Sequence, residues 1–211
     1  MNVSILSAPV HRFFPFARIS ARTALWSALT GVALVLPAFH LVNLLPLPPA
    51  TGQEEAAAAR IAGLMVWMLA LKAVIIFPVV EECLYRGLLL PMLRRSLPLW
   101  AAIALPSLLF GLTHFGLSAQ NAAFATLVGL YFSWLAIRSG SVLPAILCHG
   151  SINFFGVFIL RPLFGGPGVN PSMLYQPLPL CMLAVSLAVL LFGARRLQDE
   201  LTLPAAIPAA V

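Results

Sequence analysis

Six long apolar runs, separated by short segments with proline, glycine or charge, limit what this chain can fold into. The hydrocarbon core of a bilayer is about 30 Å thick, and a helix needs roughly 20 apolar residues to cross it. Hydrophobic residues make up 61% of the chain and charged residues 9%, which is beyond the composition of a water-soluble domain. The sequence therefore predicts an all-α, polytopic membrane helix bundle. The expected helices are 24–45, 59–94, 98–115, 120–137, 141–160 and 178–194.

Arginines mark one side of this predicted bundle, and short loops rich in Lys and Arg stay on the cytoplasmic side of a membrane. The flanking basic residues on that side are Arg12, Arg18, Arg22, Arg94, Arg95, Arg138, Arg195 and Arg196. The opposite loops carry Glu54 and Glu55, with Arg60 and Arg161 as exceptions. Both termini are therefore predicted to be cytoplasmic. Topology and anionic lipid explain the net charge of +6, and the sequence shows no clustered basic face for nucleic acid.

One membrane domain accounts for most of the chain. We expect a basic N-terminal segment at 1–23, a transmembrane domain at 24–196 and a tail rich in alanine and proline at 197–211. The first apolar run is not followed by a small-x-small cleavage site, so it is interpreted as a retained helix and not as a signal peptide. The three cysteines have no metal-type spacing and are expected to be reduced thiols.

Two adjacent glutamates and an arginine interrupt the second predicted helix, in E81-E-C-L-Y-R86. Ionisable groups at membrane depth are costly, usually face the interior of the bundle and mark functional sites. Glu82 and Arg86 stand four residues apart on a helix, so they can neutralise each other as a buried ion pair. That pairing leaves Glu81 without a partner. A carboxylate beside a second carboxylate suits general acid and base catalysis.

Two further polar pairs have the same spacing of four residues, which places each pair on one face of its helix. Phe110 and His114 pair in F110-G-L-T-H114, and His149 and Asn153 pair in H149-G-S-I-N153. At 1.5 Å per residue, these polar groups and Glu82 lie roughly 17 to 24 Å from the cytoplasmic turns. Helices that enter from independent turns thus bring polar residues to one layer. This convergence indicates a site, although either histidine alone is equally consistent with a hydrogen-bonding core residue.

The polar layer fits peptide-bond hydrolysis. Glu81 can draw a proton from a water molecule, which then attacks an amide carbonyl. Donors from His149 and Asn153 can stabilise the oxyanion that forms. His114 can orient the water or pass a proton to the leaving amine. The predicted catalytic residues are Glu81, Glu82, Arg86, His114, His149 and Asn153.

Other chemistries could use the same layer. A zinc site is the main alternative, although the sequence has no HExxH motif. Its ligands would be His114, His149 and Glu81 or Glu82. A serine nucleophile at Ser151 is weaker still, because no GxSxG motif surrounds it. We therefore expect no cofactor, with zinc as the alternative.

Three motifs, in this order, resemble those of one family of membrane proteases. E81-E-C-L-Y-R86, F110-G-L-T-H114 and H149-G-S-I-N153 are similar to the EExxxR, FxxxH and HxxxN motifs of the CPBP family. That family comprises type II CAAX prenyl endopeptidases and bacteriocin-processing or immunity proteins, also called Abi proteins. The resemblance covers about residues 64–160. Tyr85 stands where the family more often has phenylalanine, so the aromatic bulk is retained.

The resemblance implies a glutamate-dependent intramembrane endopeptidase. In the family pattern, Glu81 activates water with help from His114. His149 and Asn153 then form the oxyanion site. Older descriptions of the family assign it to the metallopeptidases, and the sequence leaves both mechanisms open.

The resemblance also implies supporting roles. Glu82 and Arg86 would position the catalytic centre. Phe110 and Tyr85 would contact the substrate, although for Phe110 a position in the core is equally consistent with the sequence.

The substrates of this family are proteins or peptides held in a membrane. Its members trim prenylated CAAX tails, process or protect against bacteriocins, or cleave C-terminal sorting tags of bacterial secreted proteins. We therefore expect a membrane-anchored or lipidated substrate that is cut near its end. The expected location is the bacterial inner (cell) membrane, where the lipid bilayer is the other partner of this multi-pass protein.

Two function classes compete with proteolysis. A non-catalytic bacteriocin immunity or membrane scaffold protein would keep the fold and tolerate the loss of Glu81. A proton-coupled transporter would also use buried glutamate and histidine, but transporters typically show repeated halves or symmetrically broken helices, which the sequence does not show.

Overall fold

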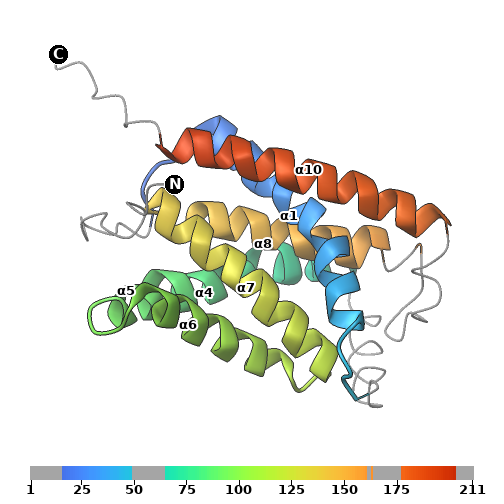
Figure 1. Ribbon diagram of the computed structural model, residues 1–211, viewed down its shortest axis with the longest axis horizontal. Helices are drawn as coiled ribbons and strands as arrows, with labels where there is room; N and C mark the ends of the chain where they lie inside the picture. Colours follow the sequence, from blue (N-terminus) through green and yellow to red (C-terminus); the bar gives the residue numbers. More distant parts are fainter. Residues whose placement is uncertain (1–15, 49–64, 161–162, 164–176, 203–211) are drawn as a thin grey trace.

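The computed structural model describes residues 16–48, 65–160, 163 and 177–202, and every regular element in these ranges is a helix (Figure 1). Four helices are long and apolar enough to cross a membrane, and Leu99–His114 is a shorter apolar helix. The four are Ala21–Asn43, Ala119–Ser139, Leu143–Leu160 and Pro179–Leu201. The predicted fold class, an all-α membrane helix bundle, is confirmed.

The described residues form six helical rods. The second rod, 66–93, is continuous but alternates between α-helical and π-helical geometry. The bounds in chain order are α1 Ala21–Asn43, α3 Val66–Ala70, η2 Leu71–Ile76, α4 Phe77–Glu82, η3 Cys83–Leu89, α5 Leu90–Leu93, α6 Leu99–His114, α7 Ala119–Ser139, α8 Leu143–Phe155, η4 Gly156–Leu160 and α10 Pro177–Thr202. The six rods match the six predicted helices in order. Residues 59–64 of the second predicted helix lie outside the described residues.

Several helix ends have a local cause in the sequence. Ser20 caps α1 by accepting a hydrogen bond from the Thr23 amide at 2.9 Å. Ser118 caps α7 in the same way through the Asn121 amide at 3.1 Å. Gly140 ends α7 in the left-handed conformation, with a φ of 66°, which glycine adopts without a steric penalty.

The arginine-rich turns gather at one end of the bundle. Figure 1 shows α5, the turn between α7 and α8, and the C-terminal end of α10 at this end. Arg22 Nη1 lies 3.6 Å from Glu200 Oε1, and Ser141 Oγ donates to the Ala17 carbonyl oxygen at 2.8 Å. The first contact holds the start of α1 to the end of α10, and the second holds the segment before α1 to the turn between α7 and α8. The cytoplasmic orientation of this end stays a prediction.

Helix α10 is longer than the sequence predicts. The expected helix ends at 194 and the expected tail begins at 197, but α10 continues to Thr202. Leu197 is fully buried, and the Arg196 guanidinium lies 4.8 Å from the Phe192 ring centroid. These contacts give the last turns of α10 an apolar face, so the helix continues past the end expected at 194. The remainder of that tail lies outside the described residues.

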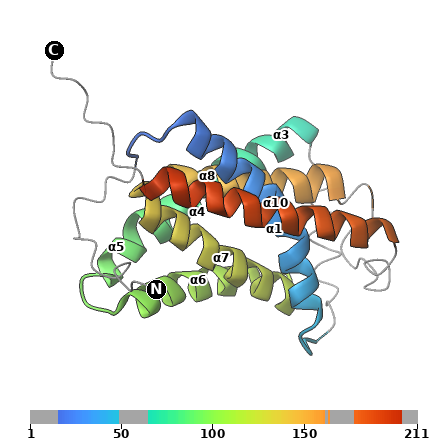
Figure 2. The same cartoon turned by 45° about the horizontal axis from the view of Figure 1, so that its top comes forward.

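Small residues allow the helices around α8 to approach closely. Figures 1 and 2 show α1 packed against both α10 and α8. A side chain at Gly31 on α1 would collide with the carbonyl oxygen of Cys148 on α8. On another side of α8, a Cβ at Gly150 would lie 2.6 Å from the Val74 carbonyl oxygen. Helix α8 is thus held at backbone distance between α1 and the second rod, as is usual in membrane bundles.

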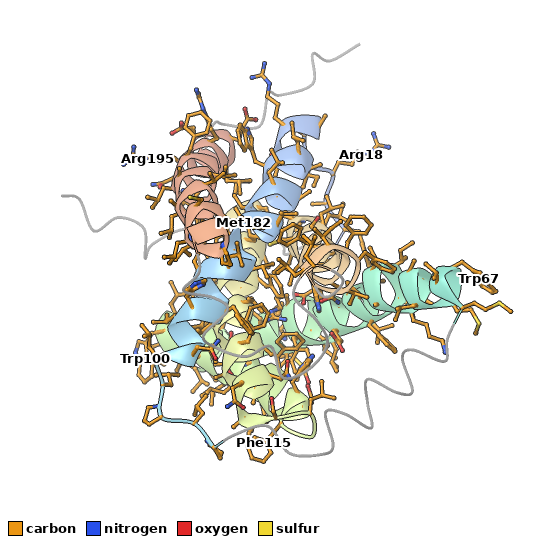
Figure 3. All side chains as sticks on the ribbon, turned by 90° about the vertical axis from the view of Figure 1, so that its right-hand side faces the viewer. Arg18, Trp67, Trp100, Phe115, Met182 and Arg195 are labelled. Atoms are coloured by element: carbon orange, nitrogen blue, oxygen red, sulfur yellow. The ribbon has the colours of Figure 1, made fainter. Side chains whose placement is uncertain are left out.

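The second rod runs obliquely through the bundle. In Figure 3, which looks along the long axis, this rod lies lengthwise and ends at Trp67, away from α1 and α10. No residue of α3 or η2 is fully buried, whereas Glu82, Tyr85 and Arg86 are buried farther along the rod. The oblique course therefore carries the charged motif from the rim of the bundle into its centre.

Candidate active site

Phe110 stands at the centre of the contacts between the predicted site residues. Its ring centroid lies 4.7 Å from that of His114, 5.4 Å from that of Tyr85 and 5.5 Å from that of His149. These residues belong to α6, η3 and α8, so the three motifs meet around one ring. Phe110 is 1% exposed and Tyr85 is 8% exposed. This burial fits the core position weighed for Phe110, and their role as substrate contacts stays a prediction.

Glu82 is fully buried and bound on one oxygen. Arg86 Nη1 donates to Glu82 Oε1 at 3.0 Å, which is the ion pair expected from their spacing. His149 Nδ1 donates to the same oxygen at 2.9 Å. The other oxygen, Oε2, is buried and has no hydrogen-bond partner among the described residues. Glu82 thus joins the second rod to α8 and has little freedom to move.

Arg86 is fully buried and is held by α7 as well as by Glu82. Its Nη2 donates to the Gly129 carbonyl oxygen at 2.8 Å, and its Nε lies 3.4 Å from Ser133 Oγ. The guanidinium also lies 4.9 Å from the Phe110 ring centroid. A buried cation is tolerable only when its donors have acceptors and its charge has a counterion. Here each of the three guanidinium nitrogens has a partner, and Glu82 supplies the opposite charge.

Glu81 is the accessible carboxylate of the two. Its side chain is 30% exposed, whereas that of Glu82 is 0% exposed. Glu81 Oε2 lies 3.7 Å from His149 Nε2, and Glu81 is also within electrostatic reach of His114. A distance of 3.7 Å is too long for a hydrogen bond, which leaves this carboxylate able to bind a water molecule.

His149 is oriented from two sides. Its ring, 4% exposed, stacks on Phe132 with centroids 5.0 Å apart and an interplanar angle of 20°. Because Nδ1 donates to Glu82, the opposite nitrogen points toward Glu81. Nε2 can donate to a ligand oxygen only when the ring carries both protons.

His114 is fixed by its own helix. Its Nδ1 lies 2.9 Å from the Phe110 carbonyl oxygen, which can only accept a hydrogen bond. Nδ1 must therefore carry a proton, so Nε2 of the neutral ring is an acceptor. This tautomer suits a residue that orients a water molecule or takes up a proton.

Asn153 is tied to the backbone of the second rod, with its Nδ2 donating to the Ala73 carbonyl oxygen at 2.8 Å. In η2 the hydrogen-bond ladder is π-helical, since the Phe77 amide donates to the Lys72 carbonyl, five residues earlier. The next residue, Pro78, has no N–H, so the Ala73 carbonyl lacks its ladder partner. The Asn153 side chain fills this vacancy, and its amide group carries a second N–H that an oxyanion role would use.

Replacing Asn153 with leucine is expected to lower the free energy of unfolding by about 1 to 3 kcal/mol, because the Ala73 carbonyl would be left without a partner. Thermal unfolding of the detergent-solubilised protein measures this effect. Asn43→Leu is the matched control, since Asn43 Nδ2 bonds only the Phe39 carbonyl in its own helix. Stability unchanged by Asn153→Leu would contradict the anchoring role.

Zinc and serine chemistry are the alternatives to glutamate catalysis at this site. No group of three or more His, Cys, Asp and Glu residues in the described ranges is arranged to hold a metal ion. Of the two histidines in the proposed zinc site, His149 donates from Nδ1 to Glu82, and His114 donates from Nδ1 to a carbonyl oxygen. Each ring keeps Nε2 for a ligand, and metal-binding histidines commonly donate their other N–H in this way, so the zinc alternative stays a prediction. Ser151 lines an apolar cavity of about 400 Å³ between α1, the second rod and α8.

Sequence analysis missed the part of α7 that supports the site, namely Gly129, Phe132 and Ser133. Their contacts use a backbone carbonyl, a ring face and a hydroxyl, none of which stands out in an apolar helix. One signal was present in G129-L-Y-F-S133, where two small residues four apart indicate close helix packing.

The resemblance deduced from the motifs is confirmed by comparison with known proteins. Residues 62–155, which include all three motifs, match the Rce1-like family, described as type II CAAX prenyl endopeptidase Rce1-like. Human CAAX prenyl protease 2 is 30% identical over 149 residues, covering 52% of this chain and 45% of the relative. The rat protein of that name is 30% identical over 132 residues, covering 52% and 41%.

The chain spans about half the length of the curated relatives it matches. No solved structure gives a significant match. The matched relatives are human and rat, so the bacterial membrane stays a prediction, while a multi-pass membrane protein is supported by the family and the apolar helices.

Proposed function

Because residues 62–155 match the Rce1-like type II CAAX prenyl endopeptidases, we propose that this chain is an intramembrane endopeptidase. Its substrate is a membrane-anchored or lipidated protein or peptide that is cut near its end. The observation that carries the proposal is the difference in burial and bonding between two adjacent carboxylates. Glu82 is buried and bound by Arg86 and His149, whereas Glu81 is 30% exposed and available to water.

In the proposed reaction, Glu81 accepts a proton from a bound water molecule. The water oxygen attacks the peptide carbonyl carbon, and the carbonyl oxygen becomes an oxyanion. In the scheme the His149 ring carries both protons, so its Nε2 and the second N–H of Asn153 donate to this oxyanion. His114 Nε2 orients the water, and the C–N bond then breaks as the proton held by Glu81 passes to the leaving amine. No metal takes part in this scheme.

The substrate class has two possible forms. A prenylated CAAX tail is favoured by the names of the matched family and relatives, which refer to CAAX prenyl proteolysis. A C-terminal sorting tag in a bacterial inner membrane is the other form. A non-catalytic immunity or scaffold protein remains the alternative function, and it would retain its effect without Glu81.

A comparison of protein C-termini in native cells tests the proposal. Cells carrying the wild-type protein or Glu81→Gln are grown in parallel, and the C-termini of membrane and secreted proteins are determined by mass spectrometry. We expect trimmed C-termini that are present with the wild type and absent with the variant at equal protein level. Identical termini, together with an unimpaired cellular role of the variant, would instead indicate the immunity or scaffold function.

A further inference from the structure

One turn of α7 faces the polar centre without contributing an acid, a base or a histidine. It runs from Gly129 to Ser133 and is buried at both ends. The Gly129 carbonyl accepts from Arg86 Nη2 at 2.8 Å and also from Ser133 Oγ at 3.0 Å. Ser133 Oγ in turn lies 3.4 Å from Arg86 Nε. The turn therefore holds the guanidinium at two of its three nitrogens.

The guanidinium occupies the space that a side chain at position 129 would need. A Cβ on Gly129 would lie 2.8 Å from Arg86 Nη2 and 3.3 Å from Phe110 Cδ1. The nearest atom is the far end of a side chain and not backbone, so an added methyl group would displace the guanidinium before it displaced the helix. The missing side chain at position 129 thus leaves the space that the Arg86 guanidinium occupies.

Phe132 packs against both hydrogen-bond partners of Glu82, namely Arg86 and His149. Its ring centroid lies 5.2 Å from the Arg86 guanidinium carbon and 5.0 Å from the His149 ring centroid. The His149 ring is stacked on it with an interplanar angle of 20°. One side chain of α7 therefore sets the plane of the imidazole while it packs against the guanidinium.

We propose that the turn Gly129–Ser133 positions the catalytic centre through Arg86 and Phe132, an inference that rests on the proposed protease function. A guanidinium is planar, so fixing Nη2 and Nε fixes the direction of Nη1 toward Glu82 Oε1. That oxygen also receives His149 Nδ1, which directs Nε2 toward Glu81. Gly129, Phe132 and Ser133 are positioning residues and not catalytic residues.

The test uses the full-length protein in liposomes and a farnesylated CAAX peptide as probe. Gly129→Ala is expected to lower kcat by about 10- to 100-fold with KM within about twofold, because a small misplacement of reacting groups affects the chemical step. Gly193→Ala is the matched control. Its Cβ would press on Thr30 Cγ2 at 2.6 Å, in the contact between α10 and α1, so kcat should stay at the wild-type value.

A second variant covers the case in which Gly129→Ala does not fold. Ser133→Ala removes the hydroxyl beside Arg86 Nε without adding bulk, and it is expected to lower kcat severalfold at unchanged KM. Ser27→Ala is its control, because Ser27 is fully buried but bonds only the Thr23 carbonyl of its own helix.

A double-substitution cycle separates positioning from packing. The lysine in Arg86→Lys lacks the planar fork, so adding Gly129→Ala to it should cause no further loss of kcat. If Arg86→Lys and Gly129→Ala lower kcat independently, so that their effects multiply in the double variant, the inference is overturned. A wild-type kcat in both Gly129→Ala and Ser133→Ala would overturn it as well. A wild-type protein that cleaves no better than Glu81→Gln, both on this peptide and in the comparison of protein C-termini, would instead remove the proposed function, and this inference with it.

Discussion

Glu81→Gln is expected to lower the rate of peptide hydrolysis by about 10²- to 10⁴-fold, the usual contribution of a general base. The amide keeps the size of the side chain but cannot accept the proton of the attacking water. The side chain is 30% exposed and bound by no short hydrogen bond, so the melting temperature should stay at the wild-type value. Cleavage of a lipidated peptide in liposomes and thermal unfolding in detergent measure the two quantities.

The neighbouring glutamate supplies the matched comparison. Glu82 Oε1 accepts from both Arg86 and His149, so Glu82→Gln should lower the melting temperature as well as the rate. A variant Glu82→Gln that stays stable and loses all activity, beside an active Glu81→Gln, would assign the base to Glu82 and refute the scheme.

Arg86→Leu is expected to cause the largest loss of stability, about 3 to 5 kcal/mol, because it leaves the Glu82 charge buried without its cationic partner. Both side chains of the pair are 0% exposed, so water cannot replace the lost contact. The free energy of unfolding is measured in detergent by denaturant titration.

A surface ion pair is the control for Arg86→Leu. Arg22 lies 3.6 Å from Glu200 with its side chain 82% exposed, and such pairs contribute less than about 1 kcal/mol. Arg22→Leu should therefore leave stability nearly unchanged. Equal stability of Arg86→Leu and the wild type would contradict the stabilising role of the buried pair.

The sequence predicts the parts of this molecule that depend on spacing. Long apolar runs define the helices, since a helix satisfies all of its backbone hydrogen bonds within one segment of a bilayer. A separation of four residues places Glu82 beside Arg86 and Phe110 beside His114, and the structure contains both contacts. The catalytic roles inferred from these residues remain predictions.

Other features depend on the backbone and therefore leave little trace in the sequence. Every residue carries a carbonyl group, so nothing marks Gly129 as the acceptor for Arg86 or Ala73 as the acceptor for Asn153. The π-helical geometry of η2 and η3 is not predicted from the apolar period of the sequence. The last turns of α10 depend on partners far away in the chain, which a local pattern cannot reveal.

The buried pair of Arg86 and Glu82 itself responds only weakly to the membrane potential. A potential of 100 mV does about 2.3 kcal/mol of work on one elementary charge that crosses the whole membrane. The two opposite charges are 3.0 Å apart, roughly a tenth of the thickness of the hydrocarbon core. The same potential therefore changes the energy of this pair by at most about 0.2 kcal/mol. Ionised groups can thus sit at membrane depth here while the voltage exerts almost no force on them.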